Sequence, residues 1–96
     1  MTSKERAKLR SLAANENALF QVGKGGISDE LVKGIGEALD KRELVKISAL
    51  KTCPYEPEEL LALLAEKLGA QSVAVTGSKL VLYRRSQVKG AAHIQL

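Results

Sequence analysis

The sequence predicts a single α/β (α+β) domain of order αβαβαββ with a four-stranded mixed sheet. Apolar residues recur at helical spacing in three segments and alternate or run continuously in four shorter ones, and the two kinds of segment alternate. Helical crossovers imply parallel strand pairs, whereas a Gly77-Ser78 turn implies a final antiparallel hairpin. We expect residues 1–86 to form the domain and residues 87–96 a flexible C-terminal tail.

The first predicted helix runs from Thr2 to about Asn15. Thr2 and Glu5 have the spacing of a capping box. A narrow apolar stripe consists of Leu9, Leu12 and Ala13. The rest of the helix is basic and carries Lys4, Arg6, Lys8 and Arg10. Such a face is either an ordinary solvated surface or one that meets nucleic acid.

A glycine-rich turn, Gly23-Lys24-Gly25-Gly26, joins a strand over 18–22 to a helix over 28–41. Glycines let the backbone approach another molecule closely, and Ser28 is a suitable N-cap. Unpaired N–H groups at a helix start, together with Lys24, suit a phosphate oxygen. A tight turn that needs glycine only for its geometry accounts for the same residues, and the turn alone does not decide between the two.

The remaining segments are predicted as a strand over 43–50, a helix from about Pro57 to a C′ residue at Gly69, and strands over 70–76 and 79–85. The last strand is almost continuously apolar, which favours a central or well-covered position. The sequence gives no reason for Gly34 and Gly36 within the second helix. The third helix starts with Glu56, Glu58 and Glu59, so we expect it to lie away from any RNA.

The charge is segregated along the chain. The net charge of +4 divides into +3 over residues 1–26, −3 over 27–78 and +4 over 79–96. If the fold brings the two ends together, they form a basic surface for a polyanion. The alternative is an unevenly charged solvated surface.

No pattern of catalytic or metal-binding residues stands out. The glycine turn fits neither the mononucleotide P-loop nor the dinucleotide fingerprint. One cysteine and one histidine cannot build a zinc site alone, so we expect Cys53 to be a loop or part-buried thiol and His93 a mobile tail residue. We therefore expect no enzymatic activity, no cofactor, no metal and no small-molecule substrate.

The sequence has neither a signal-peptide run nor a segment of about 20 apolar residues that could span a membrane. We expect a soluble, reduced, cytoplasmic protein. Its only aromatic residues are Phe20, Tyr55 and Tyr83, too few for a base-stacking sheet. Any contact with nucleic acid should therefore go mainly to phosphates. A residue such as Tyr83 is more often a core or sheet-edge residue than a stacking platform.

The chain resembles the CRM domain (chloroplast RNA splicing and ribosome maturation), in particular the small stand-alone bacterial proteins of the YhbY type. The resemblance extends from about Lys4 to Arg84. It rests on Leu9-Arg10-Ser11-Leu12-Ala13, Val22-Gly23-Lys24-Gly25-Gly26-Ile27, Glu37-Ala38-Leu39, Glu43-Leu44-Val45-Lys46, Val75-Thr76-Gly77 and Leu80-Val81-Leu82-Tyr83-Arg84.

This resemblance implies a domain similar to the C-terminal domain of bacterial translation initiation factor three. It also implies a non-catalytic protein that binds structured RNA through its glycine loop and associates with precursors of the large ribosomal subunit. The residues implied to contact RNA are Gly23, Lys24, Gly25 and Gly26, with Lys4, Lys8, Arg10 and Arg84 as weaker candidates. Two alternatives remain: a module that docks its basic face on an acidic protein partner, and a small phosphate-handling enzyme.

Overall fold

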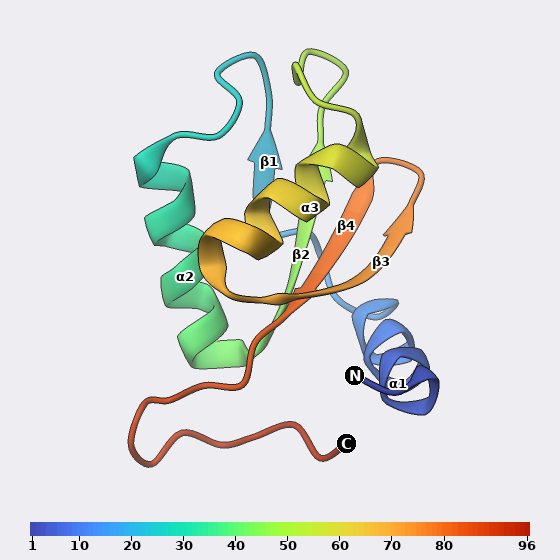
Figure 1. The fold of residues 1–96 in the computed structure, drawn as a ribbon, viewed down its shortest axis with the longest axis vertical. Helices are drawn as coiled ribbons and strands as arrows, with labels where there is room; N and C mark the ends of the chain where they lie inside the picture. Colours follow the sequence, from blue (N-terminus) through green and yellow to red (C-terminus); the bar gives the residue numbers. More distant parts are fainter.

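The computed structural model describes all residues from 1 to 96 and has the predicted element order (Figure 1). The helices and strands are α1 (Ser3–Ala13), β1 (Phe20–Val22), α2 (Asp29–Arg42), β2 (Leu44–Ala49), α3 (Pro57–Leu68), β3 (Gln71–Thr76) and β4 (Lys79–Tyr83). The α+β class and the single domain of three helices and four strands are confirmed. None of the three helices has the length and apolar content of a membrane-spanning segment.

The strands form one mixed sheet in the order β1-β2-β4-β3. β1 and β2 are parallel, and β4 is antiparallel to both β2 and β3. β4 therefore occupies the central position that its continuous apolar run predicts, and Leu80, Val81, Leu82 and Tyr83 are all buried. At the hairpin, Gly77 has the positive φ (60°) that a first turn position of type II′ requires.

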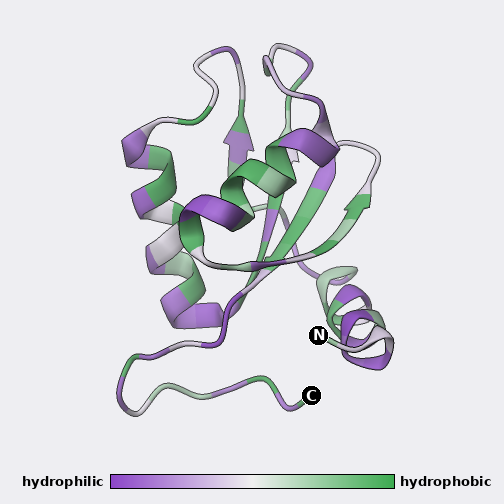
Figure 2. Ribbon diagram, viewed as in Figure 1, coloured by the Kyte–Doolittle hydropathy of each residue, from purple (hydrophilic) through white to green (hydrophobic).

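The sheet separates two apolar clusters. Because side chains alternate along a strand, Leu80 and Leu82 of β4 face α2 and α3, whereas Val81 and Tyr83 face α1. The larger cluster lies under α2 and α3 and the smaller one under α1, so the domain has three layers. In Figure 2 the apolar sides of α2 and α3 meet apolar strands, and their polar sides face away.

The helix ends follow the predicted capping rules. Thr2 and Glu5 form both hydrogen bonds of a capping box, at 2.9 and 3.1 Å. The Ser28 hydroxyl accepts a hydrogen bond from the N–H of Leu31, and Gly69 ends α3 in the left-handed region. The predicted stripe of α1 is wrong in one position: Leu9 and Ala13 are buried, but Leu12 is 41% exposed. Of the three, only Leu9 and Ala13 belong to the apolar cluster between α1 and the sheet.

The two glycines inside α2 lie where another element approaches. A Cβ on Gly34 would come within 3.2 Å of the Phe20 ring, and one on Gly36 within 3.5 Å of Leu68. Phe20 belongs to β1 and Leu68 to α3, so each glycine marks a contact between α2 and a neighbour.

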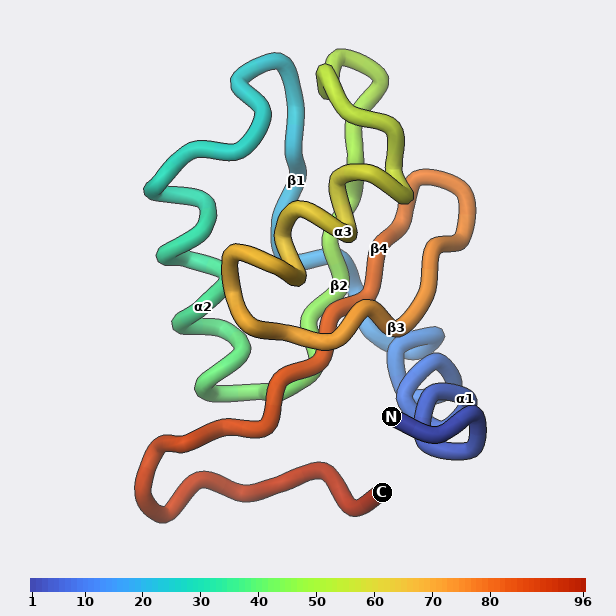
Figure 3. Tube along the Cα trace, viewed as in Figure 1, coloured from blue at the N-terminus to red at the C-terminus, as the bar shows by residue number.

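The chain after β4 forms no helix or strand, and it passes below α2 before turning back toward α1 (Figure 3). It makes specific contacts all the same. Ser86 is buried, and Ile94 packs against the cluster under α1. The Glu43 carboxylate, itself buried, accepts hydrogen bonds from the N–H groups of Ser86 (2.6 Å) and Ile94 (2.7 Å) and contacts His93 Nδ1 (2.6 Å). His93, given no role from the sequence, is thus in contact with a buried carboxylate.

Candidate nucleic-acid interface

The Gly23–Gly26 loop forms a tight turn at the end of the sheet where β1 and β2 finish. The N–H of Gly26 donates to the carbonyl of Gly23 at 3.0 Å, and Gly26 has a φ of 63°. Lys24 and Gly25 form the exposed tip, and their own N–H groups donate to no acceptor in the protein. The loop therefore presents free backbone donors and one ammonium group to the outside.

A second loop, residues 50–55 after β2, supports the first. A Cβ on Gly23 would lie 3.3 Å from both Leu50 and Thr52, and one on Gly26 would lie 3.3 Å from Pro54. The positive φ of Gly26 strains any other residue there, whereas a side chain at Gly23 needs Leu50 and Thr52 to shift by a few tenths of an ångström. Gly25 differs: a Cβ there would meet no atom within 4 Å, and its φ is not positive.

The first turn of α2 modifies the electrostatics of the loop. Ser28 caps the helix and satisfies one N–H group. Asp29 and Glu30 then place two carboxylates beside the positive end of the helix dipole. An incoming anion therefore finds its most favourable contacts at the loop tip, with Lys24 and the free N–H groups, rather than along the helix axis.

The basic residues of α1 lie elsewhere. Lys4, Lys8 and Arg10 are exposed on a helix that packs on the other face of the sheet from α2 and α3. Figure 1 shows α1 and the Gly23–Gly26 loop at opposite ends of the molecule. The structure does not bring these two sets of predicted residues into direct contact.

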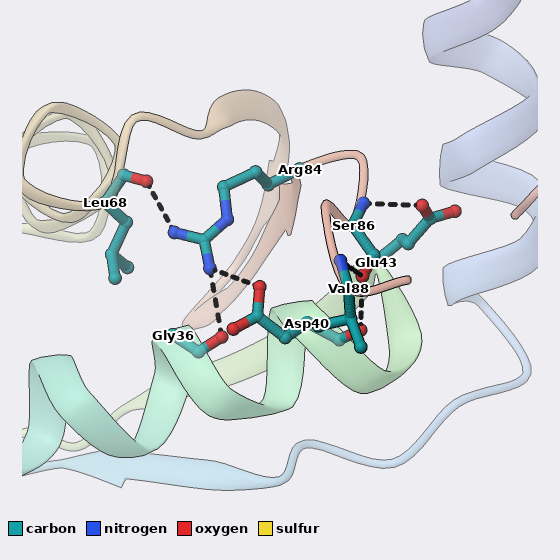
Figure 4. A network of polar contacts seen from close by, with 7 residues as sticks. All are labelled: Gly36, Asp40, Glu43, Leu68, Arg84, Ser86 and Val88. Atoms are coloured by element: carbon teal, nitrogen blue, oxygen red, sulfur yellow. Dashed lines mark hydrogen bonds and ion pairs between the residues drawn. The ribbon is translucent and has the colours of Figure 1, made fainter. Parts of the chain in front are cut away.

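Arg84 follows β4 at the end of the sheet opposite to the Gly23–Gly26 loop. Its guanidinium group forms hydrogen bonds with other residues of the protein (Figure 4). Nη1 donates to the carbonyl of Leu68 at 2.7 Å, while Nη2 donates to the carbonyl of Gly36 and the carboxylate of Asp40, both at 3.0 Å. Arg84 thus ties α2, α3 and β4 together. These three hydrogen bonds give the guanidinium group a structural role.

The carboxylates gather on the α2 and α3 layer. The segments 29–42 and 56–68 hold eight carboxylates against four cations, whereas α1 has one carboxylate and four cations. The acidic start of α3 follows β2, so it lies at the same end of the sheet as the glycine loop but on the face opposite to α1. The face that carries α1 is the more favourable one for a polyanion.

Tyr83 and Cys53, the other residues considered in the sequence, both pack against the apolar clusters of the fold. Tyr83 is buried under α1, and burial together with the nearby Glu43 charge raises the pKa of its hydroxyl group. It offers no exposed ring for stacking. Cys53 is partly buried against the larger cluster. No group of three or more His, Cys, Asp or Glu side chains is arranged to hold a metal ion.

Comparison with known proteins identifies the family. The model of the CRS1 / YhbY (CRM) domain matches residues 1–84. The chain belongs to the CRM domain family. It is 39% identical over 87 residues to the "Probable RNA-binding protein YqeI" of Bacillus subtilis (strain 168), a match that covers 91% of each chain.

A solved structure shares the fold. The fold is similar, with a TM-score of 0.77 and 38% identity, to the solution structure of the hypothetical protein SAV1595 from Staphylococcus aureus, described as "a putative RNA binding protein". The match covers 98% of this chain and 99% of that one. The family predicted from the sequence is therefore confirmed over nearly the whole chain.

Two lysines on the sheet were missed by the sequence analysis. Lys46 of β2 and Lys79 of β4 both point to the α1 face, where Lys46 Nζ donates to the carbonyls of Ala13 and Glu16 and Lys79 Nζ donates to the Ser48 hydroxyl. Strand alternation was a usable signal: Val45, Ile47 and Ala49 are buried on one face, which places Lys46 on the other.

Proposed function

We propose that this CRM-family protein is a non-catalytic RNA-binding protein that holds the sugar–phosphate backbone of structured ribosomal RNA. In this proposal it takes part in assembly of the large ribosomal subunit in the cytoplasm. Its relatives are named as RNA-binding proteins. The observation that carries the proposal is the exposed tip of the Gly23–Gly26 loop, where Lys24 stands beside two N–H groups without an internal acceptor.

In the proposed mechanism, a phosphate group docks on the loop tip. The N–H groups of Lys24 and Gly25 donate to its oxygens, and the Lys24 ammonium supplies the opposite charge. The absence of a side chain at Gly25 lets the sugar–phosphate chain come close. Contacts of this kind position RNA without reading bases, so the RNA is recognised by its shape.

The test is a binding titration on a fragment of large-subunit ribosomal RNA precursor at several salt concentrations. Lys24→Ala removes one phosphate contact, so the slope of log affinity against log salt should fall by about one unit. Gly25→Asp places a carboxylate at the tip, where a side chain fits without strain, and should weaken binding more strongly.

Two control variants make the result specific. Gly25→Ala adds an uncharged methyl group in open space, so it measures the cost of bulk at the tip and should weaken binding less than Gly25→Asp does. Lys67→Ala removes the same charge from the exposed end of α3 and should leave the slope unchanged. If Lys24→Ala and Lys67→Ala have equal effects, only general charge matters, and the loop is merely a turn.

The ribosomal part of the proposal needs a test in cell extract. We expect the protein to co-sediment with large-subunit precursor particles, and ribonuclease treatment to release it. Retention on the particles after ribonuclease would instead indicate docking on an acidic protein partner.

A further inference from the structure

We propose that a groove on the α1 face of the sheet is a second RNA site, which holds one unpaired nucleotide of the RNA gripped by the glycine loop. This inference rests on the proposed function. The groove has a volume of about 270 Å³ and runs between the end of α1 and strands β2, β3 and β4. It is lined by Arg10, Ala13, Ala14, Lys46, Ala74, Thr76, Lys79 and Val81.

The charge of the groove suits a phosphate. Three of its lining residues are cations and none is a carboxylate. Lys46 is committed to the carbonyls at the end of α1, but Arg10 is exposed and has no side-chain partner in the protein. Lys79 is exposed and donates only to Ser48. Arg10 and Lys79 can therefore both turn to a phosphate without breaking the fold.

The floor and the size suit a single nucleotide. Ala13, Ala74 and Val81 make an apolar floor on which a base can rest, and no aromatic ring is present for stacking. The volume lies near the lower end of small-ligand sites, about 300 Å³, so the groove accepts one nucleotide and is too small for a helix. A bulged or single-stranded nucleotide is the form that can enter it.

The position of the groove joins the separated parts of the predicted interface. One end lies at Arg10 on α1, and the other at Thr76 and Lys79 beside the β3–β4 hairpin. The N–H of Ala49 donates to the carbonyl of Ser78, which places this hairpin at the same end of the sheet as the Gly23–Gly26 loop. An RNA that contacts both α1 and the glycine loop therefore has a cationic path between them.

The test compares Thr76→Glu with Gln71→Glu in the RNA titration. Both residues are exposed on β3 and both changes add one negative charge, but only Thr76 lines the groove. Thr76→Glu should weaken binding about tenfold, as expected for a charge placed beside a phosphate, whereas Gln71→Glu should change affinity less than twofold. Arg10→Ala and Arg6→Ala form a second pair on α1, of which only Arg10 lines the groove.

The outcomes separate this inference from the proposed function. Circular dichroism and thermal unfolding should first show that each variant is folded. If Thr76→Glu and Arg10→Ala bind like their controls while Lys24→Ala binds weakly, the groove is not an RNA site and the loop proposal stands. If the wild-type protein binds no RNA, both fall. A fully base-paired RNA bound as tightly as one with a bulge also overturns the groove site.

Discussion

Glu43 joins the end of α2 to the C-terminal segment. It occupies the left-handed region with a φ of 65°, which ordinarily favours glycine at the end of a helix. Burial alone would raise the pKa of its carboxyl group. The hydrogen bonds from His93, Ile94 and Ser86 outweigh burial, so the pKa is lowered from its usual 4.5. The carboxylate form is therefore the one that stabilises the fold.

We expect Glu43→Gln to lower the free energy of unfolding by about 2 kcal/mol at neutral pH, because buried donors lose a charged acceptor. A lowered pKa in the folded state gives stability that is present above pH 4.5 and lost as the pH falls through the folded value. The difference in the free energy of unfolding between wild type and Glu43→Gln should therefore become smaller at acidic pH. Urea unfolding at a series of pH values checks this, and a difference independent of pH would contradict it.

The sequence could not reveal this role. Nothing in Arg42-Glu43-Leu44 marks a helix end in the left-handed region, since the usual signal is glycine or asparagine. The partners of Glu43 lie 43 to 51 positions further on, and one of them, His93, falls in a stretch without periodicity. Long-range polar contacts of single residues leave no local pattern.

At the scale of elements, the two glycines of α2 allow a matched pair of substitutions, Gly34→Ala and Gly36→Ala. Replacing a glycine inside a helix by alanine gains up to about 1 kcal/mol if the methyl group fits. At Gly36 the nearest atom, in Leu68, would be 3.5 Å away, an ordinary contact, so Gly36→Ala should stabilise the protein. At Gly34 the Phe20 ring would be 3.2 Å away and must move. Gly34→Ala should therefore gain less or destabilise; thermal unfolding ranks the two, and the reverse order would refute this explanation.

Local signals predicted the elements well. The Thr2–Glu5 capping box, the Ser28 N-cap and the Gly69 C′ residue all lie where the sequence places them, because each depends on residues close in the chain. The prediction for Leu12 was wrong because helical periodicity does not show how much of the surface of α1 the sheet covers. For the same reason, Gly34 and Gly36 were explained only once Phe20 and Leu68 were placed beside them.

At the scale of the whole molecule, the two basic ends of the chain meet only in part. Arg10 and Lys79 line the same groove, whereas Arg84 is held by α2 and α3 at the other end of the sheet. The segregated charge of the sequence predicted a basic surface but not which cations would be free. That depends on internal carbonyl acceptors, which the fold alone provides.

Shortening the chain tests whether the C-terminal segment is a flexible tail or a part of the fold. Ending the chain after residue 87 removes the His93 and Ile94 contacts, so Glu43 keeps only the Ser86 N–H and the cluster under α1 loses Ile94. We expect a loss of about 2 kcal/mol in the free energy of unfolding. A chain ending after residue 94 is the control and should unfold as wild type does, because it lacks only two exposed residues. Equal stability of both shortened chains in urea unfolding would mean that the segment is a tail. RNA affinity should be the same for both, since neither the loop tip nor the groove includes residues 88–96.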